Sequence, residues 1–237
     1  MQYVKIKDAL VEQIESGMLM PRQKLPAERK LAESFDTTRV TLREALSLLE
    51  AEGRIFREDR RGWFISPEPL KYDPTETLNF TNMALSQNRQ PHTTLVAAKA
   101  MMATKKAAEL LNLPPFSDIF RVDRVRYLED RPVVFVTNYI RTEQFPNLLS
   151  HDLSLSLTDI YREQYGVAYS KVKYRVSTTS LLGEMAQALR ATSGTPAMMV
   201  ERINYNQHGE LIDCDIEYWR HDAISIESIA QLQSNHS

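Results

Sequence analysis

Apolar residues follow a helical spacing in the first 53 residues of the chain and alternate with polar residues over much of residues 78–237. The helical spacing is clearest between Asp36 and Gly53, where apolar side chains recur at intervals of three and four. These positions are Leu42, Ala45, Leu46 and Leu49. Alternation with a period of two is typical of strands that bury one face. The two patterns in separate segments predict an α+β protein built from two parts.

Three short helices and a hairpin are predicted in the first part. The helices are expected at residues 3–15, 27–35 and 38–53. Pro26 is suited to a helix start, and Thr38 is a plausible N-cap for the third helix. Apolar residues between 55 and 65 flank a charged turn, as in a β-hairpin. This is the outline of a winged helix-turn-helix domain, which we place at residues 1–66.

A linker and a second, larger domain follow. Residues 67–77 contain three prolines separated by polar residues, which predicts a semi-rigid linker. Beyond it, "DIFRVDRVRYLEDRPVVFVTNYI" and "AMMVERINYNQHGELIDCDIEYWRHD" each read as two alternating runs around a turn, with helical patches elsewhere. We therefore expect residues 78–237 to form an α+β domain on an antiparallel sheet.

The overall composition is that of an ordinary globular protein, with 43% hydrophobic and 25% charged residues. A single cysteine, Cys214, excludes an internal disulfide, and neither a membrane-spanning run nor a signal-peptide pattern is present. The cytoplasm is the expected location, with no membrane partner. The net charge of −2 means that a nucleic-acid partner would have to bind a local basic patch.

Such a patch is predicted at the start of the third helix. Arg39 and Arg43 lie one turn apart, at the helix end where the helix dipole disfavours cations. A recognition helix enters the major groove of DNA with its N-terminal residues toward the bases. Arginine there can bind guanine with two hydrogen bonds, and Thr41 can contact a phosphate or a thymine methyl group. These residues therefore predict contact with double-stranded DNA.

Further cations flank the same surface. Arg29 lies on the second predicted helix, and Arg60 and Arg61 lie in the wing turn. The alternative interpretation is a solvated basic face, which is the usual setting of surface arginine. An ordered set of cations on two helices and a wing favours DNA binding.

The segment "KLPAERKLAESFDTTRVTLREALSLLEAEGRIFREDRRGWFI" resembles the DNA-binding domain of GntR-type bacterial transcription regulators. The resemblance implies that Arg29, Arg39, Thr41 and Arg43 contact operator DNA. The chain departs from the family at Val40, where a second threonine is common.

The wing also departs from the family pattern. The family often has G-x-G-T-F in the wing, whereas only Gly62 remains here, preceded by Arg60 and Arg61. A phosphate or minor-groove contact by these two arginines is therefore a separate expectation for this chain.

Charged residues alternate on two predicted strands of the second domain. Arg124 and Arg126 project from one face of their strand, and two guanidinium groups together suit a phosphate, phosphonate or carboxylate. Asp213, Asp215 and Glu217 alternate likewise on another strand. Both sets together could bind a small zwitterion. The alternative is that the strands pair through salt bridges worth ~0–1 kcal/mol each.

The segments "RVRYLEDRPVVFVTNYI" and "NQHGELIDCDIEYWRHD" resemble the UTRA effector domain of the HutC branch of GntR regulators, which shares its fold with chorismate lyase. The resemblance implies a homodimer with a small-molecule site on this sheet. The arginine pair falls at the family's anion-binding position, and Ser170 lies near another ligand position. Tyr218 is a candidate for an aromatic wall of the site, with packing as the alternative.

Within this branch the chain looks most like regulators of 2-aminoethylphosphonate use, a ligand with a phosphonate and an ammonium group. Sensors of phosphosugars or urocanate share the framework and remain alternatives. Val136 replaces a ligand-binding glutamate of many relatives, which counts against a hydroxyl-rich sugar. Repression is the commoner mode of the family, although an activator would carry the same residues.

Two other classes of function are weaker interpretations. An enzyme would need a nucleophile or an acid–base pair, and neither G-x-S-x-G nor a glycine-rich nucleotide loop is present. A constitutive architectural DNA binder would leave two thirds of the chain without a role. We expect no cofactor, and no metal site, because His208 and His221 lack partners at ligand spacing.

Overall fold

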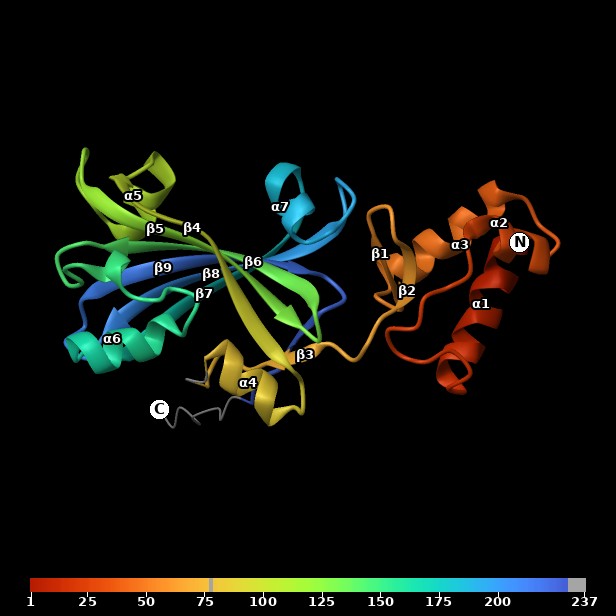
Figure 1. Ribbon diagram of the computed structural model, residues 1–237, viewed down its shortest axis with the longest axis horizontal. Helices are drawn as coiled ribbons and strands as arrows, with labels where there is room; N and C mark the ends of the chain where they lie inside the picture. The colour runs from red at the N-terminus through yellow and green to blue at the C-terminus, as the bar shows by residue number, and fades with distance from the viewer. Residues whose placement is uncertain (77–78, 230–237) are drawn as a thin grey trace, which may run out of the picture.

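The structure, a computed structural model, describes residues 1–76 and 79–229. Residues 77–78 and 230–237, which belong to the predicted linker and second domain, lie outside the described residues. The molecule is elongated, with a small helical part at one end and a larger sheet part at the other (Figure 1).

The N-terminal part consists of three helices and a two-stranded hairpin. Its elements are α1 (Gln2–Glu15), α2 (Glu28–Ser34), α3 (Arg39–Ala51), β1 (Ile55–Glu58) and β2 (Gly62–Ile65). Thr38 caps α3, because its hydroxyl accepts a hydrogen bond from the amide of Thr41 at 3.2 Å. The four apolar positions of α3 that recur with helical spacing are completely buried in the core of this part.

The predicted linker contains a short strand. β3 (Leu70–Tyr72) pairs in parallel with β10 (Ile224–Ile226) near the other end of the chain. Helix α4 (Phe80–Ser86) follows, and Asn79 caps it by accepting a hydrogen bond from the amide of Asn82. This segment is therefore packed on the sheet part, which anchors the chain where it leaves the hairpin.

The sheet part is built on six antiparallel strands. They are β4 (Pro91–Met102), β5 (Asp118–Leu128), β6 (Arg131–Arg141), β7 (Tyr169–Ser180), β8 (Pro196–Asn206) and β9 (Leu211–Arg220). Their order in the sheet is β4-β5-β6-β9-β8-β7, and all neighbours are antiparallel. The expectation of an α+β fold with a winged helix-turn-helix and an antiparallel-sheet domain is confirmed.

Helices cover both faces of this sheet (Figure 1). They are α4, α5 (Lys105–Leu111), the short 3-10 helix η1 (Leu148–Ser150), α6 (Leu157–Tyr165) and α7 (Gly183–Ala188). α4 and α6 pack on the face that carries Val136 and Ile140, whereas α5 and α7 pack on the face of Phe135 and Tyr139. None of the described helices is both long and apolar enough to cross a membrane.

Candidate functional site

The first turns of α3 present their predicted DNA-contacting side chains to solvent. Arg39 is exposed, and the side chain of Val40 is 70% exposed. Thr41 is half-buried, and its hydroxyl lies 3.1 Å from that of Thr38. The opposite side of the helix is buried, so packing orients this polar edge outward.

Arg43 is held by a network that sequence reasoning did not find. Its Nε donates to Glu28 at 2.7 Å, and the same carboxylate accepts a hydrogen bond from the indole of Trp63 at 3.2 Å. Burial opposes ionisation of Glu28, but these two hydrogen bonds hold the pKa of its carboxyl below the usual value. Glu28 therefore joins α2, α3 and the wing and sets the orientation of Arg43.

The remaining predicted DNA contacts lie on the same part of the molecule. Arg29 in α2 and Arg60 in the wing turn are strongly exposed, whereas Arg61 forms an ion pair with Glu58 at 2.5 Å. Gly62 has a φ of +101°, and a Cβ there would lie 3.4 Å from the side chain of Lys24. A side chain at this position would be strained, which explains why this one wing glycine is present.

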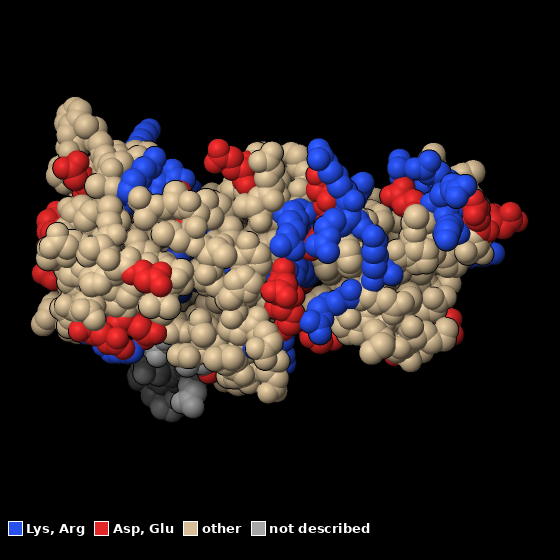
Figure 2. Space-filling model, in the orientation of Figure 1, with Lys and Arg blue, Asp and Glu red and all other residues tan. Residues whose placement is uncertain are grey.

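Figure 2 shows Lys and Arg side chains gathered over the N-terminal part and its border with the sheet part. The visible face of the sheet part carries few of them. This local concentration is the basic patch that a protein with a net charge of −2 requires for an anionic polymer.

A second candidate site is a cavity of about 1110 Å³ on the sheet part, on the side where α4 and α6 pack. Arg124 and Arg126 of β5 and Asp215 of β9 contribute to its lining, because these two strands flank β6 and present these side chains on the same face of the sheet. The helix caps Asn79 and Ser156 also line it and are hydrogen bonded to each other at 3.2 Å. The cavity therefore has charged groups on the sheet side and polar groups at the helix caps, where Asn79 also donates to Asp159 of α6 at 3.0 Å.

Arg124 is buried beside the cavity without an acidic partner among the described residues. Its Nη atoms donate to the carbonyl oxygen of Leu155 and to Asn138 Oδ1, both at 3.1 Å, and its Nε has no partner there. Burial, and secondly the charge of Arg126, lower the pKa of Arg124 to about 10. It still carries its charge near neutral pH, so a buried cation lacks a counter-ion.

Two other arginines of the cavity, Arg126 and Arg202, are compensated by carboxylates of β9. Arg126 lies 3.5 Å from Glu217, and Arg202 lies 3.5 Å from Asp215 and 3.8 Å from Glu217. Arg202 was not predicted as a site residue. The hairpin register that places it directly opposite Asp215 is the signal that could have identified it. The salt-bridge alternative thus holds for Arg126 but not for Arg124.

Asp213 lies behind the cavity rather than in its lining. Its carboxylate accepts hydrogen bonds from Tyr161 at 3.0 Å, Tyr169 at 2.7 Å and Asn204 at 2.8 Å. Burial, followed by the nearby charge of Asp215, raises the pKa of Asp213 to about 7 despite these hydrogen bonds. Asp213 therefore holds Tyr169, which lines the cavity, and the buried Tyr161, and it does not offer a free carboxylate to a ligand.

This raised pKa predicts a specific pH dependence of stability. Between the unfolded pKa of 3.8 and about 7, the folded protein binds a proton that the unfolded chain does not. Stability is therefore expected to rise as the pH falls through this window. Thermal unfolding from about pH 8 to about pH 5 should show this trend in the wild type relative to Asp213→Asn. A constant difference between the two proteins would contradict the assignment.

Two other predicted effector residues are placed differently from the arginines. Ser170 lines the cavity, but its hydroxyl donates to the carbonyl oxygen of Asn206. Tyr218 projects from the other face of β9, where it packs with residues covered by α5 and α7. Alternation along the strand requires this, because Asp215 and Glu217 occupy the cavity face. Tyr218 is therefore not part of the cavity.

Metal chemistry finds no support in the described part of the chain. No group of three His, Cys, Asp or Glu side chains there is arranged to hold a metal ion.

Comparisons with known proteins identify the class that this geometry defines. Residues 2–65 match the model of bacterial regulatory proteins of the gntR family, and residues 86–225 match the UTRA domain. The chain belongs to the gntR family of transcription regulators that carry a UTRA effector domain. We therefore call residues 2–65 the DNA-binding domain and the sheet part the effector domain.

Among the relatives, the HTH-type transcriptional regulator YihL of Escherichia coli is 29% identical over 93% of this chain and 94% of the relative. The HTH-type transcriptional repressor NagR of Bacillus subtilis is 28% identical over 93% of this chain and 90% of the relative. The crystal structure of PhnF from Mycobacterium smegmatis covers 96% of this chain and 100% of its own, with a TM-score of 0.67 and 22% identity. The last likeness shows that the fold is shared.

Proposed function

We propose that this protein is a homodimeric repressor that binds a two-fold operator through α3 and the wing and responds to a small anionic or zwitterionic effector in the cytoplasm. 2-Aminoethylphosphonate is the effector that we favour. The observation that carries the proposal is Arg124, a buried cation beside a large cavity without a carboxylate partner in the described residues.

The charge of Arg124 explains why an anion should bind there. Moving a charged group out of water costs on the order of several kcal/mol unless an opposite charge or strong hydrogen bonds compensate for the lost hydration. Two neutral acceptors provide partial compensation, and a phosphonate or phosphate would add charge-assisted hydrogen bonds to the Nη atoms. Binding of the anion would therefore also compensate the buried charge of Arg124.

The compensated residues suit the other end of a zwitterion. Asp215 and Glu217 lie on the same face of the sheet as Arg124. Arg202 pairs with both carboxylates, whereas Arg126 pairs with Glu217 alone. An ammonium group near Asp215 would exchange one cationic partner for another. This redistribution inside the network is the change that effector binding would make in the protein.

A phosphosugar is the second candidate, and the size of the cavity favours it. About 1110 Å³ exceeds the space that a ligand as small as 2-aminoethylphosphonate fills. The polar caps Asn79 and Ser156, with Thr158, would hydrogen bond to sugar hydroxyl groups.

A calorimetric titration distinguishes these candidates. We expect saturable binding of 2-aminoethylphosphonate to the full-length protein, with glucosamine 6-phosphate and urocanate as competitors. Binding of the phosphonate alone supports the proposed effector, whereas binding of the sugar phosphate alone replaces it with the second candidate. If none of the three compounds binds, all three are excluded as effectors. The DNA-binding proposal is tested separately.

A further inference from the structure

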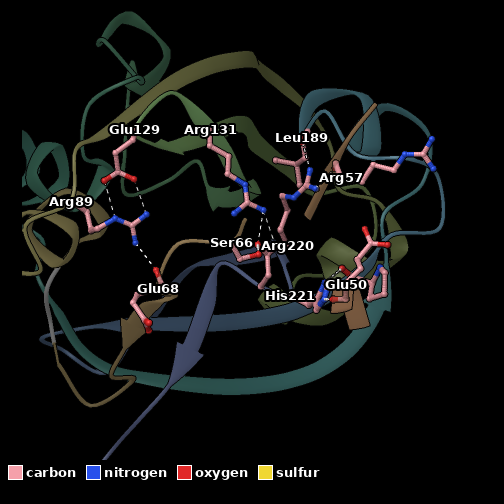
Figure 3. Close-up of polar contacts among 12 residues, drawn as sticks. Glu50, Arg57, Ser66, Glu68, Arg89, Glu129, Arg131, Leu189, Arg220 and His221 are labelled. Carbon is pink, nitrogen blue, oxygen red and sulfur yellow. Dashed lines mark hydrogen bonds and ion pairs between the residues drawn. The ribbon is translucent and has the colours of Figure 1, made fainter. Parts of the chain in front are cut away.

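The end of β9 lies at the border between the effector domain and the wing (Figure 3). The guanidinium group of Arg220 donates short hydrogen bonds to two main-chain carbonyl groups, those of Leu189 and Arg57, each at 2.6 Å. Leu189 belongs to the effector domain and Arg57 to strand β1 of the wing. A single side chain therefore joins the two domains.

Two further contacts hold the wing at this border. The buried carboxylate of Asp222 accepts hydrogen bonds from Arg131 of the effector domain at 2.8 Å and from Ser66, just after β2, at 2.9 Å. The amide of Asp59, in the wing turn, donates to the carbonyl oxygen of Arg190 at 2.8 Å. The wing is thus attached to the effector domain at both its base and its turn.

Two buried arginines contact the same aromatic ring at this border. Arg131 and Arg220 both face the ring of Phe56, at 3.4 Å and 5.6 Å from its centroid. Arg220 is only 1% exposed and has no carboxylate within 4 Å among the described residues. Burial, and secondly the charge of Arg131, lower the pKa of Arg220 to about 10. The lost hydration of these two buried cations therefore opposes the hydrogen bonds and ring contacts that hold the border together.

The same strand leads directly to the effector cavity. Glu217 precedes Arg220 by three residues and lies in the charged network with Arg126 and Arg202. The indole of Trp219 donates to Glu217 at 2.8 Å, which links this carboxylate to the residue next to Arg220. Glu217 is therefore connected to the end of β9 both along the strand and through the indole of Trp219.

We propose that Arg220 and Asp222 are positioning residues that hold the wing against the effector domain, and that β9 transmits changes in the cavity to the DNA-binding domain through them. The inference rests on the proposed function only for the identity of the signal. The positioning role itself is a property of the ligand-free protein. Because allosteric coupling requires an element with two arrangements, this border is the part of the molecule that should differ between them.

Hydrogen exchange measured by mass spectrometry on the full-length protein tests the positioning role without a ligand. In Arg220→Met we expect amide exchange in wing residues 55–65 to accelerate at least about tenfold, equivalent to ~1.4 kcal/mol of lost local protection. Ser66→Ala removes only the cross-domain hydrogen bond to Asp222 and should accelerate the same peptides to a smaller extent. This second variant leaves every effector-domain side chain in place.

Arg175→Met is the matched control, because Arg175 is an exposed arginine on β7, away from the border. It should leave wing exchange unchanged. Wing exchange at the wild-type rate in both border variants would overturn the proposal. An equal acceleration throughout the six-stranded sheet would also overturn it, since Arg220 would then only stabilise the effector domain.

A second comparison uses 2-aminoethylphosphonate as the probe. If it binds, it should change wing exchange in the wild type and in Arg175→Met but not in Arg220→Met. An unchanged response in Arg220→Met would overturn transmission through this residue. If calorimetry shows no binding to the wild type, the proposed effector fails, whereas the ligand-free comparison still decides the positioning role.

Discussion

Replacing Arg124 with methionine is expected to abolish effector binding without destabilising the ligand-free protein. The variant removes a buried charge that has only neutral acceptors, Leu155 and Asn138, among the described residues. Replacing buried charges with apolar side chains of similar volume is often neutral or stabilising, by ~1–4 kcal/mol. Loss of the charge-assisted hydrogen bonds should weaken effector binding by ~2–5 kcal/mol.

Two measurements on the same protein check this prediction. Thermal unfolding should show an unchanged or higher melting temperature, by roughly 2–4 °C for each kcal/mol gained. Calorimetry should show loss of 2-aminoethylphosphonate binding. Arg162→Met is the control, because Arg162 lines the same cavity at its solvent-exposed rim and pairs with Asp159. Retained binding in Arg124→Met, or a marked loss of stability, would show that Arg124 is a structural residue.

Replacing Arg43 with alanine is expected to abolish specific operator binding and to leave effector binding intact. Arg43 lies at the exposed edge of α3, and its ion pair with Glu28 fixes its orientation. Loss of one base or phosphate contact costs ~1–3 kcal/mol, and a homodimer would lose it in both half-sites. The combined loss of ~2–6 kcal/mol removes most of the difference between specific and non-specific DNA binding.

The measurement is fluorescence anisotropy with a duplex selected by the wild-type protein from a randomised pool, at one fixed salt concentration. Arg54→Ala is the matched control. Arg54 also belongs to the DNA-binding domain, but it follows the C-terminal end of α3 and pairs with Glu15. It should bind the selected duplex nearly as well as the wild type. Equal losses in the two variants would mean that α3 does not read the operator in the proposed way.

Much of the fold could be predicted because its determinants are local. The apolar spacing along α3, the cap at Thr38 and the alternating strands each depend on residues close together in the chain. The position of Arg39 and Arg43 on the exposed side of α3, away from its buried face, could be predicted for the same reason. The turn expected within "DIFRVDRVRYLEDRPVVFVTNYI" is also present, with Glu129 and Asp130 at positive φ between β5 and β6.

Contacts between residues that are far apart in the chain could not be predicted from the sequence in the same way. Nothing in the linker composition predicted that Leu70–Tyr72 would pair in parallel with Ile224–Ile226, because the partners lie at opposite ends of the effector domain. The role of Glu28 likewise depends on three elements meeting at one carboxylate. Side-chain partners of this kind follow from packing rather than from local spacing.

The sequence by itself determined the class of protein, the two-part α+β architecture and the basic edge of α3, since these follow from periodicity and from a family pattern carried by neighbouring residues. Only the tertiary structure decided that Arg124 of the cavity has no carboxylate partner among the described residues and that Tyr218 faces away from the cavity. It also revealed that Arg220 joins the two domains. The reason is physical: the environment of a buried charge depends on strand register and domain contact, which bring together residues far apart in the chain.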